Sequence, residues 1–170
     1  MTTKLLNNEV IEQVEEIFTG LQEPVQVLFF GSQQDCDYCD DTLQLVQEVV
    51  DISDKLELSI YDIEDDAALA SQYNVDKAPG LVLAGRDGDQ ILDYGVRYAG
   101  IPSGHEFSSL IHTLLLVSGR DSDLSKDTRQ KLRELDTPVH LMGVVPPTGP
   151  CCPRAGILAR QMAGDSPGIE

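Results

Sequence analysis

The sequence has no tryptophan, few basic residues and no long apolar run, and two of these absences exclude whole classes of function. Its 170 residues contain 12 lysines and arginines against 29 aspartates and glutamates, which gives a formal net charge of −17. Such a chain has no basic stripe with which to bind a nucleic-acid backbone or to dock on anionic lipid. No stretch approaches the roughly 20 apolar residues that a membrane-spanning helix needs. We therefore expect neither nucleic acid nor a membrane among its partners.

The N-terminal stretch MTTKLLNNEVIEQVEE also lacks the features of a signal peptide, because glutamates interrupt it before an apolar run forms. We accordingly expect the chain in the cytoplasm. Structural disulfides are rare there, so its four cysteines indicate metal binding or redox chemistry. Apolar residues make up 41% of the chain, enough for the core of one domain or of one domain plus part of another.

The order of helical and strand patterns predicts a mixed α/β fold. A βαβ unit is followed by a ββα unit, which together close a small mixed central sheet flanked by helices on both faces. The hairpin turn is predicted from RDGDQ, and Ser103 with Glu106 is expected to form a capping box for the last helix of this unit. The other predicted elements are helices at 5–20, 39–53 and 65–73 and strands at 24–30, 56–61 and from Pro79 onward.

Two cysteines, Cys36 and Cys39, lie in the sequence CDYC between the first predicted strand and the second predicted helix. Cys36 is expected at the helix N-terminus, where free N–H groups and the helix dipole favour a thiolate that can attack a disulfide. Cys39, one helical turn later, can then attack the mixed disulfide and release the reduced substrate. A strand–CxxC–helix arrangement in a βαβ unit is the redox motif described for thioredoxin-like proteins.

Three other uses of this cysteine pair stay open. A structural zinc site would need two further ligands, and the three histidines form no companion pair. A purely structural disulfide would close a two-residue loop and so stabilise little. An iron–sulfur cluster shared between two glutaredoxin-like chains would use Cys36 as a ligand and would also need a thiol cofactor site.

Pro79, in the sequence DKAPG, is the second candidate site residue. In a thioredoxin fold a cis-proline at this place faces the redox cysteines and leaves the backbone of the preceding residue, here Ala78, available to an extended substrate. A trans-proline that merely starts an edge strand is the plainer alternative. Tyr38, between the cysteines, would provide an apolar rim for the substrate.

Acidic residues surround the cysteine pair. Each carboxylate opposes ionisation of Cys36, which predicts a thiol pKa near that of a free cysteine. It also predicts a dithiol–disulfide couple with a low reduction potential, typical of a reductant. Asp62 or Glu64 could relay a proton to Cys39, although a solvated acid at a strand end is the simpler interpretation. The acids beside the thiols are Asp35, Asp37, Asp40 and Asp41, of which the last two also complement the helix N-terminus.

An internal repeat extends beyond residue 118. The segment TPVHLMGV matches EPVQVLFF at an offset of 114 residues, and Cys152 falls opposite Cys39. Residues 119–170 are therefore expected to form an incomplete second unit that consists of a helix (125–136), a strand (137–145) and the start of a helix. Residues 1–118 would form the complete first unit.

The segments CDYC, YDIEDD, NVDKAPG, YGVRYAGIPSGHEFSSLI and TPVHLMGVVPPTGPCCPRA resemble the prokaryotic protein disulfide oxidoreductases. These are glutaredoxin-like proteins built from two tandem thioredoxin folds, each with its own CxxC. The resemblance implies a thioredoxin-like fold for 1–118, with Cys36 as attacking thiol, Cys39 as resolving thiol and Pro79 as the cis-proline. Where the second unit of the family has Cys-Pro-Tyr-Cys, this chain has Gly149, Pro150, Cys151 and Cys152, a degenerate second site.

The resemblance implies a thiol–disulfide oxidoreductase that reduces or exchanges protein disulfides through a mixed-disulfide intermediate. The redox-active cysteine pair would need no further cofactor and no metal. A flavoprotein like thioredoxin reductase, or a small thiol, would supply the electrons. The alternative from another class is a redox-inactive binding module that uses the thioredoxin fold, with its CxxC as a structural or zinc-binding clip.

Overall fold

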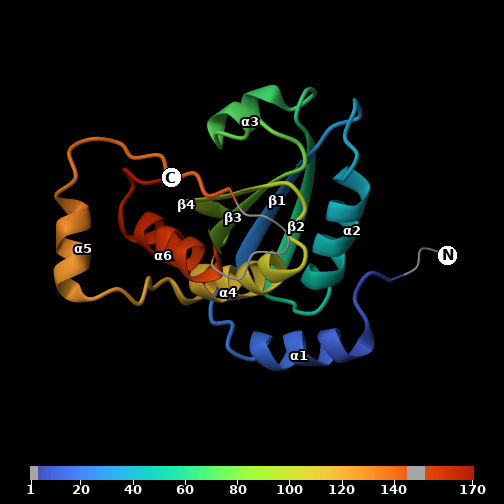
Figure 1. Cartoon of the computed structure of the whole chain (residues 1–170), viewed down its shortest axis with the longest axis horizontal. Helices are drawn as coiled ribbons and strands as arrows, with labels where there is room; N and C mark the ends of the chain where they lie inside the picture. The colour runs from blue at the N-terminus through green and yellow to red at the C-terminus, as the bar shows by residue number, and fades with distance from the viewer. Residues whose placement is uncertain (1–3, 145–151) are drawn as a thin grey trace.

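The computed structural model describes residues 4–144 and 152–170 and leaves the side chains of residues 152 and 153 undescribed. Helices and strands follow each other in the predicted order over the first 119 residues, and two further helices follow (Figure 1). The elements are α1 (Asn8–Phe18), β1 (Val25–Gly31), α2 (Cys39–Val50), β2 (Leu56–Asp62), α3 (Ala67–Gln72), β3 (Gly80–Asp87), β4 (Gln90–Ala99), α4 (His105–Gly119), α5 (Lys126–Arg133) and α6 (Cys152–Asp165).

The strands form one mixed sheet in the order β2-β1-β3-β4. β1 runs parallel to β2, with Val25 opposite Leu56 and Gly31 opposite Asp62. β3 runs antiparallel to both β1 and β4. All seven residues of β1 are buried, as expected of a short continuous apolar run with a strand on each side and helices over both faces. The predicted α/β class and mixed sheet are confirmed.

Helices cover both faces of the sheet and divide the core into two clusters. On one face, α1, α2 and α4 pack side chains such as Val14, Val46 and Leu114 against the strands. On the other face, α3 packs Ala70 and the neighbouring Tyr73 against β1 and β3. The alternation of strand side chains between the faces explains the division, because successive residues of a strand point to opposite sides.

Two turns position the ends of β3 and β4. Gly88 has a φ of 58° in the tight turn between these strands, which confirms the predicted hairpin. The predicted capping box is wrong. The N-cap of α4 is Gly104, with a φ of 60° and no side-chain hydrogen bond, and α4 begins at His105. Because the chain turns at Gly104, Ser103 contributes only its carbonyl oxygen, which accepts a hydrogen bond from the backbone N–H of Glu106.

The described part of the C-terminal segment, residues 120–144 and 152–170, packs against the first unit through α6. α6 contacts α4 and β4, while α5 stands away from the sheet at the left of Figure 1. The strand predicted at 137–145 does not form over its described part, residues 137–144, where Val139 makes one isolated bridge with Ile169. The physical reason is that no described strand lies beside this segment to pair with it along its length.

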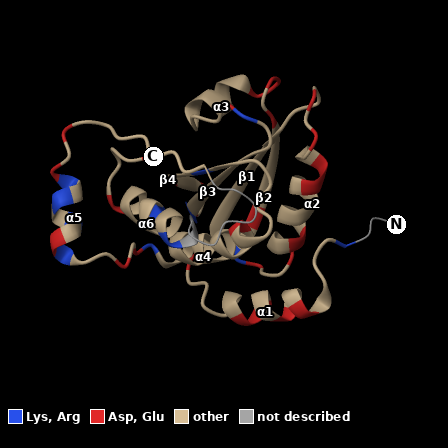
Figure 2. Cartoon of the chain, viewed as in Figure 1, with Lys and Arg blue, Asp and Glu red and all other residues tan. Residues whose placement is uncertain are grey.

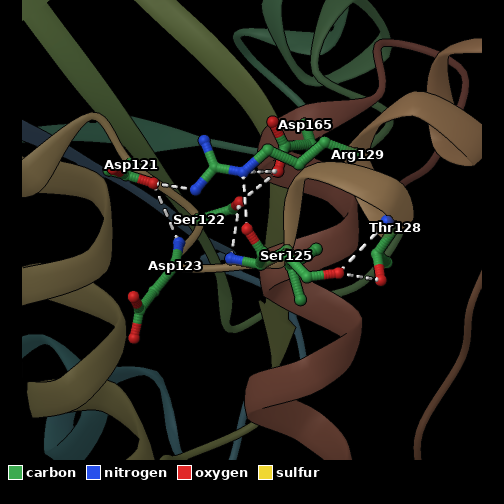
Figure 3. Close-up of polar contacts among 8 residues, drawn as sticks. Asp121, Ser122, Asp123, Ser125, Thr128, Arg129 and Asp165 are labelled. Atoms are coloured by element: carbon green, nitrogen blue, oxygen red, sulfur yellow. Dashed lines mark hydrogen bonds and ion pairs between the residues drawn. The ribbon is translucent and has the colours of Figure 1, made fainter.

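Polar contacts hold α5, α6 and the segment between α4 and α5 (residues 120–125) together (Figure 3). Arg129, on α5, contacts Asp121 and Asp165 and donates to the carbonyl oxygen of Leu124 at 2.8 Å. The hydroxyl of Ser122 donates to the same Asp165 carboxylate. Ser125 caps α5 by accepting a hydrogen bond from the backbone N–H of Thr128. Since α5 has no buried residue, these polar contacts fix its position.

Within the part of the chain that the structure describes, no helix has both the length and the apolar character needed to span a membrane.

Candidate redox site

Cys36 and Cys39 are joined by a disulfide, with a Cα–Cα distance of 5.5 Å. Cys36 lies in the loop between β1 and α2, and Cys39 is the first residue of α2, which begins where the sequence predicts it. Because Tyr38 is the N-cap, Cys36 lies before the helix and not at its N-terminus as expected. The first helical hydrogen bond runs from Thr42 N–H to the Tyr38 carbonyl oxygen, so Cys36 lies in the turn before the helix.

The two sulfur-bearing residues differ in exposure. Cys36 is half-buried and borders a surface groove, whereas Cys39 is 8% exposed and belongs to the main core cluster. The sulfur of Cys39 accepts a hydrogen bond from the backbone N–H of Ser32 at 3.4 Å. Of the two, Cys36 is thus the one accessible to a large substrate, while Cys39 lies behind it within bonding reach.

Gly31 closes the space behind the disulfide. A Cβ atom at this position would lie 2.8 Å from Cε1 of Phe29 and 3.7 Å from the sulfur of Cys39. A larger residue would therefore push the Phe29 ring away from its place beside the buried sulfur. Gly31 was not among the predicted site residues, although a glycine at the end of a buried strand is a signal of close backbone approach.

A groove of about 460 Å³ lies in front of Cys36. Ala78 also lines the groove, and the peptide bond between Ala78 and Pro79 is cis, as predicted. The ladder of β3 begins at Gly80, so Ala78 precedes the paired strand. Cys36 and the residue before the cis-proline therefore border the same groove. Its other lining residues include Ser32, Asp35, Glu64, Val75 and Asp76.

The remaining predicted site residues are less central. Tyr38 is 57% exposed and does not line the groove, so its role as a substrate rim stays a prediction. Cys151 lies outside the described residues. Cys152 is the first residue of α6, but its side chain is not described. The degenerate second site therefore stays a prediction.

Asp62 and Glu64 brace the cysteine loop. The Asp62 carboxylate accepts hydrogen bonds from the backbone N–H groups of Gln33, Glu64 and Asp65 at 3.2, 2.9 and 3.1 Å. The Asp65 N–H is the main cause that lowers the pKa of the Asp62 carboxyl, and the other hydrogen bonds outweigh its desolvation. These partners favour the simpler of the two interpretations of Asp62, an acid at a strand end, here one that orders the loop.

Glu64 and Ser32 make a second contact between the same loops. The hydroxyl of Ser32 donates to Oε1 of Glu64 at 2.9 Å, and the backbone N–H of the same serine reaches Cys39. Ser32 is a site residue that sequence reasoning missed. Its position directly after the buried strand was the available signal, because loops at the carboxyl ends of parallel strands meet at one edge of a sheet.

Comparisons with known proteins agree with this site. No model of a known protein family matches the sequence. The chain is 27% identical over 132 residues to the AhpF subunit of alkyl hydroperoxide reductase of Pseudomonas aeruginosa, a match that covers 78% of this chain and 22% of that protein. It is 26% identical over 149 residues to the AhpF protein of Staphylococcus aureus, covering 88% of this chain and 26% of that protein. The chain thus spans about a quarter of the length of these relatives.

Solved structures share the fold. A protein disulfide oxidoreductase from Aeropyrum pernix superposes with a TM-score of 0.84 at 28% identity, over 94% of this chain and 68% of that one. The NTD_N/C domain of the alkyl hydroperoxide reductase AhpF from Enterococcus faecalis superposes with a TM-score of 0.82 at 23% identity, over 97% of this chain and 77% of that one.

Fold and cysteine pair together place the chain in the class of proteins that carry a CxxC disulfide on a thioredoxin-like fold. Within that class it is similar to the protein disulfide oxidoreductase of Aeropyrum pernix and to the AhpF proteins of alkyl hydroperoxide reductase, which confirms the resemblance that the sequence motifs indicate.

Proposed function

We propose that the chain catalyses thiol–disulfide exchange on protein disulfides, with Cys36 as the attacking and Cys39 as the resolving thiol. In the reductive direction the Cys36 thiolate attacks one sulfur of the substrate disulfide, and the other substrate sulfur leaves as a thiolate. Cys39 then loses its proton and attacks Cys36 in the mixed disulfide. The substrate leaves with both cysteines reduced, and the enzyme is left with the Cys36–Cys39 disulfide that the structure contains.

One observation carries this proposal, namely the unequal exposure of the two sulfur-bearing residues at a groove that Ala78, the residue before the cis-proline, also lines. Cys36 borders the groove with Ala78, while Cys39 is buried in the core behind it. An extended substrate segment beside Ala78 would bring its disulfide to Cys36 and leave Cys39 shielded until the mixed disulfide forms. A passive structural clip would have no use for this asymmetry.

The cysteine pair is proposed to work without another cofactor and without a metal, because it holds the two electrons itself. A flavoprotein related to thioredoxin reductase, or a small thiol, would return the chain to its reduced form. The proposal places this exchange in the cytoplasm, where such reductants keep thiols reduced.

The similarity to AhpF proteins supports a second candidate function, electron transfer to a hydroperoxide-reducing protein. Several of the relatives are AhpF proteins of an alkyl hydroperoxide reductase. The dithiol would then pass its electrons to a hydroperoxide-reducing protein through the same mixed-disulfide chemistry. Reduction of a disulfide in a peroxide-reducing protein by this chain, but not of insulin, would favour this candidate.

Insulin reduction by dithiothreitol tests the proposal. The intact chain should accelerate precipitation of the insulin B chain, and Cys36→Ser should abolish the acceleration. The double variant Cys151→Ser, Cys152→Ser is the matched control and should retain full activity, because those thiols belong to the incomplete unit. Equal acceleration by the intact chain and Cys36→Ser would overturn the proposal and favour a redox-inactive binding module.

A further inference from the structure

The groove in front of Cys36 is acidic. Three carboxylates line it, from Asp35 in the cysteine loop, Glu64 after β2 and Asp76 before Ala78. No lysine or arginine occurs among the described residues that line it. A ligand that reaches Cys36 must therefore approach carboxylates contributed by three separate loops.

Most of this negative charge has no cation beside it. Elsewhere several arginines form ion pairs with acids, as in the contacts of Arg97 with Asp93 and of Arg160 with Glu106. Asp76 also has a partner, since Lys77 lies 2.7 Å from its carboxylate. Asp35 and Glu64, in contrast, have no ion-pair partner among the residues that the structure describes.

Hydrogen bonds hold the carboxylate of Glu64 at the groove. The hydroxyl of Ser32 donates to it, and Ser32 in turn donates its backbone N–H to Cys39, so this carboxylate is fixed relative to the disulfide. Asp62, directly before the same loop, adds a further carboxylate whose pKa is lowered mainly by the N–H of Asp65. Asp62 therefore stays ionised at neutral pH and adds its charge to the field that a ligand meets.

The acidic and basic side chains are also distributed unevenly over the described residues, with acids near the groove and bases away from it. Figure 2 shows acidic residues along α1 and α2 and at the loop tips before α2 and α3, whereas basic residues gather on α5. A cleft lined by charge of one sign focuses its field and can raise association rates by about 10- to 1,000-fold at low salt. The reactive end of the molecule thus attracts a cationic ligand before contact is made.

We propose that the acidic groove selects disulfides flanked by lysine or arginine in the partner protein. This inference rests on the proposed thiol–disulfide exchange and specifies its substrate class. A basic side chain one or two residues from the reactive cysteine would enter the groove beside Glu64 and Asp35 as the cysteine reaches Cys36. An acidic side chain at the same place would meet like charge. Charge complementarity of this kind acts mainly on association and on specificity.

Two disulfide-linked peptides that differ only by lysine or glutamate beside one cysteine provide the test. At about 0.01 M ionic strength, where the Debye length is about 30 Å, the intact chain should show at least about a tenfold higher kcat/KM for the lysine peptide. At about 1 M, where the Debye length is about 3 Å, the two values should agree within about twofold.

Charge-neutralising variants locate the effect. Glu64→Gln keeps an oxygen acceptor for Ser32, and Asp35→Asn suits the positive φ of 49° at that position. Each should lower the lysine-to-glutamate ratio at low salt by about threefold, and both together by more. Asp54→Asn is the matched control and should leave the ratio unchanged, because Asp54 lies between α2 and β2, at the opposite end of these elements from Cys36.

Equal kcat/KM values for the two peptides at low salt, measured with a chain that reduces insulin, would overturn the selectivity and leave the proposed function intact. An equal fall of the ratio in Asp54→Asn and Glu64→Gln would also overturn it, because net charge and not the groove would then be responsible. Failure to reduce either peptide, together with failure on insulin, would instead overturn the proposed function and this inference with it.

Discussion

Residues 25–31 and residues 139–144 share a sequence pattern but lie in opposite environments. The first segment is β1, paired with β2 on one side and β3 on the other, and every residue in it is buried. The second makes a single bridge to Ile169, and its apolar side chains Met142 and Val144 are 68% and 87% exposed. The same kind of residue run thus ends in the core of one unit and on the surface of the other.

The difference shows that an apolar run becomes a strand only where neighbours satisfy its backbone. β1 receives hydrogen bonds along both edges and helices over both faces. The backbone of the second segment instead bonds to residues 168–170, through Val139 N–H to the Gly168 carbonyl oxygen and Leu141 N–H to the Glu170 carbonyl oxygen. A strand without a sheet gains too few hydrogen bonds and too little burial to offset the entropy of ordering it.

The way each region is held together also differs. Both core clusters are built from residues up to Val117. The C-terminal segment instead attaches through contacts such as Arg160, whose guanidinium lies 4.4 Å from the Tyr98 ring centre and donates to the Ser109 hydroxyl at 2.6 Å. The first region therefore contains both core clusters, whereas the described part of the second is attached to it by contacts of α6 with α4 and β4.

The largest expected effect compares equivalent positions of the two segments, Leu28 and Met142. Leu28→Ala should lower the free energy of unfolding by about 2–5 kcal/mol, because it leaves a cavity between Phe30 and Val82. Met142→Ala should change it by less than about 0.5 kcal/mol, since this side chain is exposed. Urea unfolding measures both. Similar losses would mean that residues 139–144 contribute to a core of their own.

A smaller effect is expected from the attachment between the regions. Arg160→Met should lower stability by about 1–3 kcal/mol, because it removes the contact with Tyr98 and leaves the half-buried Glu106 without its cation. Limited proteolysis should then cut between residues 120 and 144 sooner. Arg133→Met, an exposed change on α5, is the control and should leave the cleavage rate as it is. Unaltered protection in Arg160→Met would show that other contacts hold the segment.

The third prediction concerns how the stability contributed by Asp93, on the edge strand β4, depends on pH. Burial raises the pKa of Asp93, but hydrogen bonds from Arg97 and from the backbone N–H of Gly95, with the charge of Arg97, outweigh it and lower the pKa overall. The folded pKa lies below the unfolded value of about 4, so this stabilisation is complete above that pH and is lost as the pH falls through the folded pKa.

Asp93→Asn should therefore cost about 1 kcal/mol or less at pH 7 and progressively less in acid. Unfolding free energies of the intact chain and the variant, measured at pH 7 and at several lower values, give this difference. A difference that stays constant or grows toward low pH would contradict the sign.

The smallest effect concerns two fully buried threonines. The hydroxyl of Thr42, on α2, has no hydrogen-bond partner among the described residues, whereas that of Thr113, on α4, donates to the Ser109 carbonyl oxygen. Thr42→Val should raise stability by up to about 1 kcal/mol, and Thr113→Val should lower it by about the same amount. Thermal unfolding of both variants measures the difference. Destabilisation of equal size in both would mean that Thr42 has a partner.

Local patterns predicted the first unit well. The order of its elements and the hairpin turn at Gly88 follow from short stretches that fold in the way their own residues favour, whereas the cis bond before Pro79 was expected from the thioredoxin fold. The cysteine pair was found because motif, preceding strand and following helix lie within 26 consecutive residues, 25–50.

Tertiary context decided the features that were missed. Glu106 was expected to cap its own helix, but its carboxylate faces Arg160 from a segment 54 residues away. The strand at 137–145 fails over its described part because the described residues offer it no partner strand, a fact that its own sequence does not record. Ser32 and Gly31 contribute to the site through backbone atoms and close packing, which side-chain chemistry does not reveal.

Trapping of the mixed disulfide tests most directly whether Cys36 attacks and Cys39 resolves. In a background where Cys151 and Cys152 are replaced by serine, Cys39→Ser should accumulate a covalent adduct with a disulfide substrate, and intact mass with peptide mapping should place it on Cys36. Cys36→Ser should accumulate none, because the remaining thiol is buried. An adduct on Cys39 formed at a comparable rate, or no adduct in either variant, would contradict this account.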